Sequence, residues 1–173
     1  ALLFTPLVML STSSSIQKFF PLFEKHKRHP LLSLSISIII FGSVFFIPLF
    51  FIFKKSVLPN MPSYAKGNEA ELFFNFILPI TVLYAFINFF FSYSSIFKKI
   101  AIPAFFQVSN KFFTPIIVLL YFLSVIDTHM SVYVLIGCYL FALLGMIIYL
   151  FRRNRIHWTN PFQSFKVVRA KDY

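Results

Sequence analysis

Charged residues and cysteine are what this sequence has least of. Only 12% of its 173 residues are charged and five of them are acidic, whereas a soluble domain carries about a quarter charged residues. The single cysteine, Cys138, excludes a disulfide framework and a cysteine-based metal site. The four histidines lack the spacing of metal ligands, so we expect neither a bound metal nor a cofactor. No carboxylate lies well within an apolar block, which excludes a proton relay built on buried acids.

Apolar residues are abundant instead. They make up 58% of the chain, 27 residues are phenylalanine, and the mean hydropathy is +0.80. A water-soluble core cannot hide this much apolar surface, so lipid is the expected solvent and the phenylalanines are expected to face it. The net charge of +11 raises the question of nucleic acid. The cations fall between apolar blocks, which is the membrane pattern, so we expect no nucleic-acid partner.

Five apolar blocks have the length of a membrane span, since a bilayer core about 30 Å thick needs roughly 20 helical residues. The sequence therefore predicts an all-α, polytopic transmembrane helix bundle over residues 1–151. Residues 152–173 form a basic, polar segment after the bundle. The predicted spans are residues 1–23, 31–53, 72–94, 105–126 and 131–151.

Lysine and arginine predict the orientation of these spans. Alternate ends carry thirteen cations on one side and three on the other, and the richer side is normally cytoplasmic. Loops 24–30 and 95–104 and the tail 152–173 are therefore expected inside the cell. The first span would then start outside, so we expect at least one further helix upstream and a larger membrane protein around this chain.

Polar residues recur at helical spacing in two of the spans, so each set shares one face. The third span carries Thr81, Tyr84, Asn88, Ser92 and Ser95, and the fourth carries Gln107, Asn110, Lys111 and Thr114. Such residues either join helices through hydrogen bonds or line a water-filled cavity. The sequence leaves both interpretations open.

Two lysines lie within the predicted spans. Lys18 and Lys111 are each about six residues from the cytoplasmic side, or roughly 9 Å at 1.5 Å per residue. A lysine side chain can reach the interface over that distance. The alternative is that both ammonium groups point into an inward-facing cavity and meet an anionic headgroup.

Two stretches carry a resemblance to a known family. They read SSSIQKFFPLF, followed by a basic loop, and ILPITVLYAFINFFFSYSSIFKKIAIPAFFQVSNKFFTPIIVLLYFLSVI. The order of a polar helix end, a short basic loop and a Gln-x-x-Asn-Lys face resembles polysaccharide-biosynthesis flippases, the O-antigen and lipid-linked oligosaccharide translocases. These belong to the multidrug/oligosaccharidyl-lipid/polysaccharide exporter superfamily. The resemblance covers nearly the whole chain through hydropathy and small sequence cues.

The resemblance implies a fold and a function. The chain would hold the second to sixth helices of the N-terminal lobe of a MATE-like flippase, with a second lobe after Tyr173. It would not be an enzyme. By alternating access it would move a lipid-linked oligosaccharide, on an undecaprenyl-pyrophosphate carrier, from the cytoplasmic to the outer leaflet of the bacterial inner membrane. Its partners would be that substrate, membrane lipids and the missing helices. The candidate cavity residues are Lys18, Asn88, Gln107, Asn110, Lys111 and Thr114.

Two other classes of protein share some of these features. A membrane-embedded glycosyltransferase or polysaccharide polymerase would need acid and base residues in a large outer loop. Residues 54–71 offer Glu69 and Glu71 without an obvious partner. A non-transporting membrane anchor predicts no polar stripes, and the two stripes count against it.

Overall fold

The structure is a computed structural model that describes residues 4–10, 12–21, 28–60, 68–97 and 101–152. Within these ranges every regular element is a helix and there is no strand. The predicted all-α fold is confirmed. Loops 24–30 and 95–104 are described only in part, and the tail beyond Arg152 lies outside the described residues.

Four helices in the described part of the chain are long and apolar enough to cross a membrane. Each of them overlaps one of the last four predicted spans. A short 3₁₀ turn, η2 (Leu58–Asn60), follows the first of them. The four helices are α3 (Arg28–Val57), α4 (Asn68–Ile96), α5 (Ala101–Phe122) and α6 (Thr128–Arg152).

The first predicted span, residues 1–23, differs from the expectation of one continuous helix. It contains two short helices, α1 (Thr5–Met9) and α2 (Thr12–Phe19), of five and eight residues. The chain turns at Leu10, whose φ of 46° is left-handed. The Thr12 hydroxyl donates a hydrogen bond of 2.6 Å to the carbonyl oxygen of Met9. Serine and threonine hydroxyls compete in this way with the helix's own hydrogen bonds, and residues 11–15 are all serine or threonine.

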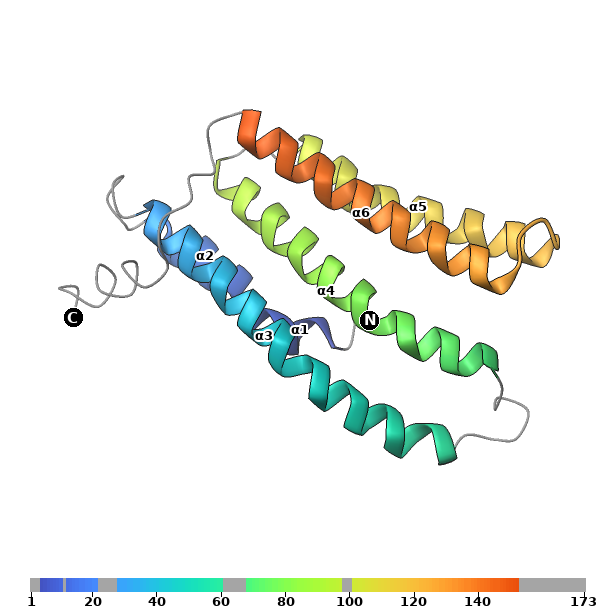
Figure 1. Cartoon of the computed structure of the whole chain (residues 1–173). Coiled ribbons are helices and arrows are strands. Elements are labelled where there is room, and N and C mark those ends of the chain that lie inside the picture. Colours follow the sequence, from blue (N-terminus) through green and yellow to red (C-terminus); the bar gives the residue numbers. More distant parts are fainter. Residues whose placement is uncertain (1–3, 11, 22–27, 61–67, 98–100, 153–173) are drawn as a thin grey trace.

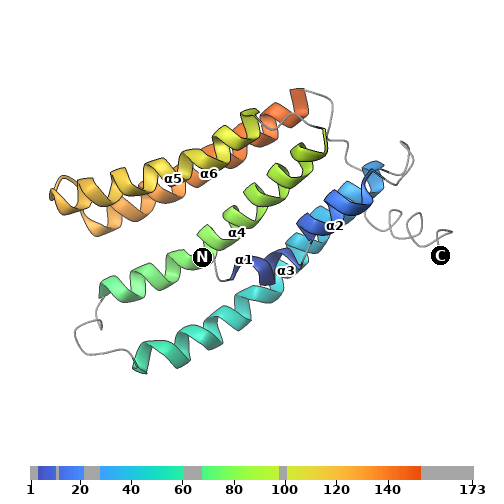
Figure 2. The same cartoon turned by 180° about the vertical axis from the view of Figure 1, so that it is seen from behind.

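Helix α4 lies at the centre of the arrangement (Figure 1). Helices α1, α2 and α3 lie on one side of it and α5 and α6 on the other, and both views agree on this (Figures 1 and 2). Helix α4 contacts α1, α2, α3, α5 and α6. Seen from behind, α5 lies in front of α6, and α1 and α2 lie in front of α3 (Figure 2).

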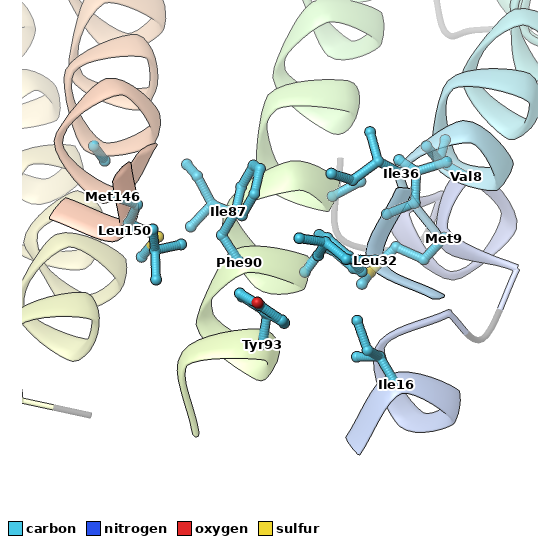
Figure 3. Close-up of a cluster of buried hydrophobic side chains, with 14 of the residues drawn as sticks. Val8, Met9, Ile16, Leu32, Ile36, Ile87, Phe90, Tyr93, Met146 and Leu150 are labelled. Carbon is cyan, nitrogen blue, oxygen red and sulfur yellow. The ribbon is translucent and has the colours of Figure 1, made fainter. Parts of the chain in front are cut away.

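Apolar side chains on both sides of α4 form the core (Figure 3). Ile87 is fully buried, and Met146 and Leu150 of α6 form part of the same cluster. On the other side the cluster continues through buried residues of α1, α2 and α3, namely Val8, Met9, Ile16, Leu32 and Ile36. Burying a large apolar side chain contributes roughly 1.5–3 kcal/mol in water. In a bilayer, close packing replaces that term, because lipid tails are as apolar as leucine.

Many large apolar side chains lie outside this core. Phe41 of α3 is 68% exposed and Phe112 of α5 is 69% exposed. Such residues on the outer faces of long apolar helices suit hydrocarbon as the solvent. The helices therefore fit a membrane protein.

The α3–α4 hairpin is joined near its turn by a half-buried cation, Lys54. The Lys54 Nζ donates hydrogen bonds to Glu71 Oε1 at 3.0 Å and to Asn75 Oδ1 at 2.7 Å. The Lys54 side chain is 14% exposed and that of Glu71 is 61% exposed. The bonds connect the end of α3 to the first turns of α4.

Glycine lets backbones approach closely at one point beside the helix break. A Cβ added at Gly42 of α3 would collide with the backbone carbonyl oxygen of Val8 in α1. At Gly145 of α6 it would collide with the Phe106 ring, which can rotate away, whereas a Cβ at Gly137 meets nothing within 4 Å. Gly42 therefore provides the space in which α1 ends against α3.

We predict that Gly42→Ala destabilises the fold and that Gly137→Ala does not. The Gly42 variant should lose about 1–3 kcal/mol because a rigid backbone must shift. Alanine at Gly137 should be neutral or slightly stabilising, since alanine is the better helix former. Thermal unfolding in detergent, followed by circular dichroism, measures the difference. Equal midpoints for the two variants would show that the α1–α3 contact is not formed as described.

Candidate functional site

A polar cleft lies beside the break between α1 and α2. Its volume is about 340 Å³, which falls within the size range of small-molecule sites, roughly 300–1,000 Å³. We use the name "polar cleft" for the space lined by Thr5, Pro6, Met9, Ser13, Ser14, Tyr84 and Asn88.

The break in the first span creates this cleft. Because the chain turns at Leu10, α1 and the first turn of α2 line the cleft from one side. Tyr84 and Asn88 lie one turn apart on α4 and face it from the other. Irregular backbone at membrane depth is stable only where protein buries it or where it lines a wet cavity. Protein buries part of the break, since Thr5, Val8 and Met9 of α1 are buried, and the cleft lies beside it.

The polar groups of the cleft keep unused hydrogen-bonding capacity. Among the described residues, the Ser14 hydroxyl, the Tyr84 hydroxyl and the amide nitrogen of Asn88 have no hydrogen-bond partner. Other hydroxyls behave differently. Thr81 donates to the Ile77 carbonyl oxygen at 2.7 Å, and several serines bond to their own helix in the same way, namely Ser35, Ser37, Ser43 and Ser94.

Asn88 and Gln107 join the two polar stripes. The amide nitrogen of Gln107 on α5 donates a hydrogen bond of 2.9 Å to the Asn88 Oδ1 atom on α4. Both side chains are half-buried. This bond links two helices, and it also holds the Asn88 oxygen, so that the NH₂ group of Asn88 is left for the cleft. Asn88 therefore joins α4 to α5 and also lines the polar cleft.

A second polar contact holds α2 against α4. The Gln17 Nε2 donates a hydrogen bond of 3.1 Å to the Ser95 Oγ atom, and the Ser95 hydroxyl donates one of 2.7 Å to the Ser92 carbonyl oxygen. Ser92 and Ser95 belong to the predicted stripe of α4, and they contribute to helix packing in place of the cleft. The stripe of α4 therefore has two parts. Ser92 and Ser95 lie where α4 contacts α2, and Tyr84 and Asn88 line the polar cleft.

The two lysines are not brought together. Lys18 lies on α2, and its side chain is exposed with Nζ 5.6 Å from the Phe19 ring centroid. Lys111 is exposed on α5, which flanks α4 on the opposite side (Figure 2). Neither lysine lines the polar cleft. Of the two lysines, Lys18 is nearer in sequence to a residue of the cleft lining, because it follows Ser14 by about one helical turn in α2.

The other two candidates contribute nothing visible to the cleft. Thr114 is half-buried on α5 and is not part of its lining. The side chain of Asn110 lies outside the described residues. Of the six candidate residues, Asn88 lines the cleft and Gln107 contacts Asn88.

Several cleft residues were missing from the sequence-based candidates. Tyr84 precedes Asn88 by four residues, and Ser14 precedes Lys18 by four, so same-face spacing is the signal in the sequence that could have found both. Thr5 and Ser13 required knowledge of the break, which the apolar pattern conceals.

The described part of the cleft lining is neutral. Among the described residues that line it, none carries a charged side chain. Within the described ranges there is also no group of three or more His, Cys, Asp or Glu residues placed to hold a metal ion. Hydroxyl, phenol and amide groups suit water or an uncharged, hydroxyl-rich ligand.

Comparisons of this chain with protein-family models, with curated proteins and with solved structures found no match in any of the three.

We predict that the cleft admits water. In a Cys138→Ser background, cysteines placed at Ser14 or Asn88 should react with a membrane-impermeant thiol reagent. A cysteine at Phe112, which is 69% exposed on the outer face of α5, should react at least tenfold more slowly if that face meets lipid. Mass spectrometry of the labelled protein in native membranes gives the rates. Protection of Ser14 and Asn88 equal to that of Phe112 would mean that the cleft is dry.

Proposed function

We propose that the chain is part of a membrane transporter that moves a lipid-linked oligosaccharide from the cytoplasmic to the outer leaflet of a bacterial inner membrane. The observation that carries this proposal is the polar cleft at the broken first span. Its hydrogen-bonding groups lie between helices otherwise suited to hydrocarbon. The lysine one turn away supplies a positive charge.

A membrane anchor has no use for such a cleft. Each polar group without a partner costs free energy in hydrocarbon, and a continuous helix of leucine and phenylalanine avoids that cost. Bonds to the helix's own carbonyl oxygens account for Thr81 and Ser94, and bonding between helices accounts for the Gln17–Ser95 contact. It does not account for Ser14 and Tyr84. A transporter needs polar groups that are free to exchange water for cargo.

Three features of the described residues suit an amphipathic lipid as the cargo. The exposed apolar faces of α3 and α5 suit a polyprenyl chain that stays in the bilayer. The neutral cleft suits sugar hydroxyls, and Lys18 suits a phosphate. An ammonium group pairs with phosphate as a point charge and gains strength where water is limited. Only an amphipathic molecule with a lipid tail, an anion and a polar head uses all three.

We predict that Lys18→Gln slows translocation and that Lys111→Gln does so much less. The full-length protein is reconstituted in liposomes that carry undecaprenyl-pyrophosphate with a short oligosaccharide. Translocation is followed as exposure of the sugar to a glycosidase outside. Loss of the Lys18 charge should lower the initial rate about tenfold, because one charge-assisted hydrogen bond is lost.

The same experiment tests the alternatives. A transporter returns the lipid with its mass unchanged, whereas a glycosyltransferase or polymerase returns an extended or shortened glycan. An anchor gives the rate of protein-free liposomes. Equal slowing by Lys18→Gln and Lys111→Gln would remove the link between translocation and the cleft.

A further inference from the structure

We infer that one face of α5 binds a further membrane-spanning helix that carries an aspartate or a glutamate near its middle. Lys111 lies at the centre of this face. We use the name "Lys111 seam" for the face and define it by Ala104, Val108, Lys111, Pro115 and Val118. The inference does not depend on the proposed function, because it follows from the depth, the spacing and the charge of these residues.

Lys111 lies deeper in its helix than the sequence predicts. Helix α5 runs from Ala101 to Phe122, so Lys111 follows the first residue by 10 positions and precedes the last by 11. It is therefore roughly 15 Å from either end at 1.5 Å per residue. The span predicted at residues 105–126 places it only roughly 9 Å from the cytoplasmic side. The four-carbon stem of lysine reaches the interface from the shallower position and not from the deeper one.

No described residue neutralises this charge. Lys111 is exposed on α5, and within the described ranges it makes no hydrogen bond and no ion pair. A charged side chain that faces lipid at mid-membrane is costly, and membrane proteins normally pair such a residue with an opposite charge. The depth of Lys111 therefore requires a partner from outside the described helices.

The residues around Lys111 have the spacing of a helix-packing seam. Members of the Lys111 seam follow one another at intervals of 4, 3, 4 and 3, which is the repeat with which one helix packs along another. Val108 is 37% exposed and Val118 is 47% exposed, so the described helices leave the seam open. Its side chains beside Lys111 are shorter than Phe105 and Phe112 on the adjoining face, and short side chains let a second helix approach closely.

The charge of Lys111 identifies the chemistry of the second helix. A lysine within a packing seam fixes the register of two helices, and a carboxylate at the same depth completes the pair. None of this chain's acidic residues lies near the middle of a described helix, so a second copy of these helices does not supply that carboxylate. Lipid phosphates lie outside the hydrocarbon core and do not supply it either. The acidic residues are Glu24, Glu69, Glu71, Asp127 and Asp172.

Photo-cross-linking of the full-length protein in its native membrane tests this inference. The photoreactive residue p-benzoylphenylalanine replaces Val108 or Val118 in the seam. Phe112, about 100° around the helix from Lys111, is the matched control position. Mass spectrometry identifies the peptide or lipid that is joined to each position.

The two seam positions should cross-link to one apolar segment of about 20 residues. Because Val108 and Val118 lie on either side of Lys111 along α5, their cross-linked sites should bracket an aspartate or a glutamate in that segment. Phe112 should cross-link to lipid. Cross-links from the seam to lipid alone, to a second copy of this chain, or to a segment with no acidic residue between the two sites would overturn the inference.

Charge exchange at Lys111 tests the ion pair itself. Lys111→Glu should lower the cross-link from Val108 about tenfold, since two like charges then meet. Replacing the acidic residue of the second helix by lysine should restore it. Lys111→Arg should leave the cross-link unchanged. Lys111→Gln keeps N–H donors for the carboxylate and should lower the cross-link only slightly, in agreement with its small expected effect on translocation.

A further variant separates lost pairing from failed insertion. Leucine favours insertion into a membrane where lysine opposes it, so Lys111→Leu should be present in the membrane at the wild-type level or above. Its cross-link from Val108 should nevertheless fall. An unchanged cross-link in both Lys111→Leu and Lys111→Glu would show that Lys111 has no acidic partner. Translocation is not measured in these experiments, so their failure and the failure of the proposed function are distinguishable.

Discussion

Hydrocarbon offers no hydrogen bonds, and this constraint governs the polar groups within the described apolar helices. The long helices α3 to α6 meet it by pairing most of their backbone groups internally, and Pro48, Pro79 and Pro115 each remove one such bond from their helix. The first span does not, because the chain turns at Leu10 and interrupts its helix. The Thr12 hydroxyl takes one freed carbonyl oxygen, and Gly42 allows α1 to end against α3. The polar cleft lies beside this break, and on this account water or a ligand completes the hydrogen bonding of Ser14, Tyr84 and Asn88 there.

The polar side chains therefore divide into two groups with different physical roles. Most hydroxyls within α3 and α4 donate to a carbonyl oxygen of their own helix. Such a bond needs no second helix, so it is no evidence for a functional site. Ser14, Tyr84 and Asn88 converge from two helices and keep donors and acceptors in reserve. A stripe of polar residues in a membrane helix is informative only after this division has been made. Helix α4 shows both kinds along one face.

Part of this arrangement was predictable from the sequence. Apolar blocks of about 20 residues predicted the long helices, and the 3–4 spacing of polar residues predicted that Asn88 and Gln107 share faces that can meet. The break was not predicted, because the apolar pattern of residues 1–23 resembles one continuous span, although the serine and threonine run at residues 11–15 is a local signal for it. The separation of Lys18 from Lys111 was also not predicted, because it depends on how the helices pack. Their depths are alike, but sequence does not say that α4 lies between their helices (Figure 1).

Backbone exchange at the helix break tests the central claim, that the polar cleft is wet, most directly. The first N–H groups of α2, at Thr12 to Ser14, have no carbonyl of their own helix to bond. With the protein in nanodiscs, hydrogen–deuterium exchange should be complete there within minutes, while the middle of α6 is protected for hours. Protection at Thr12–Ser14 as strong as that of α6 would contradict the account.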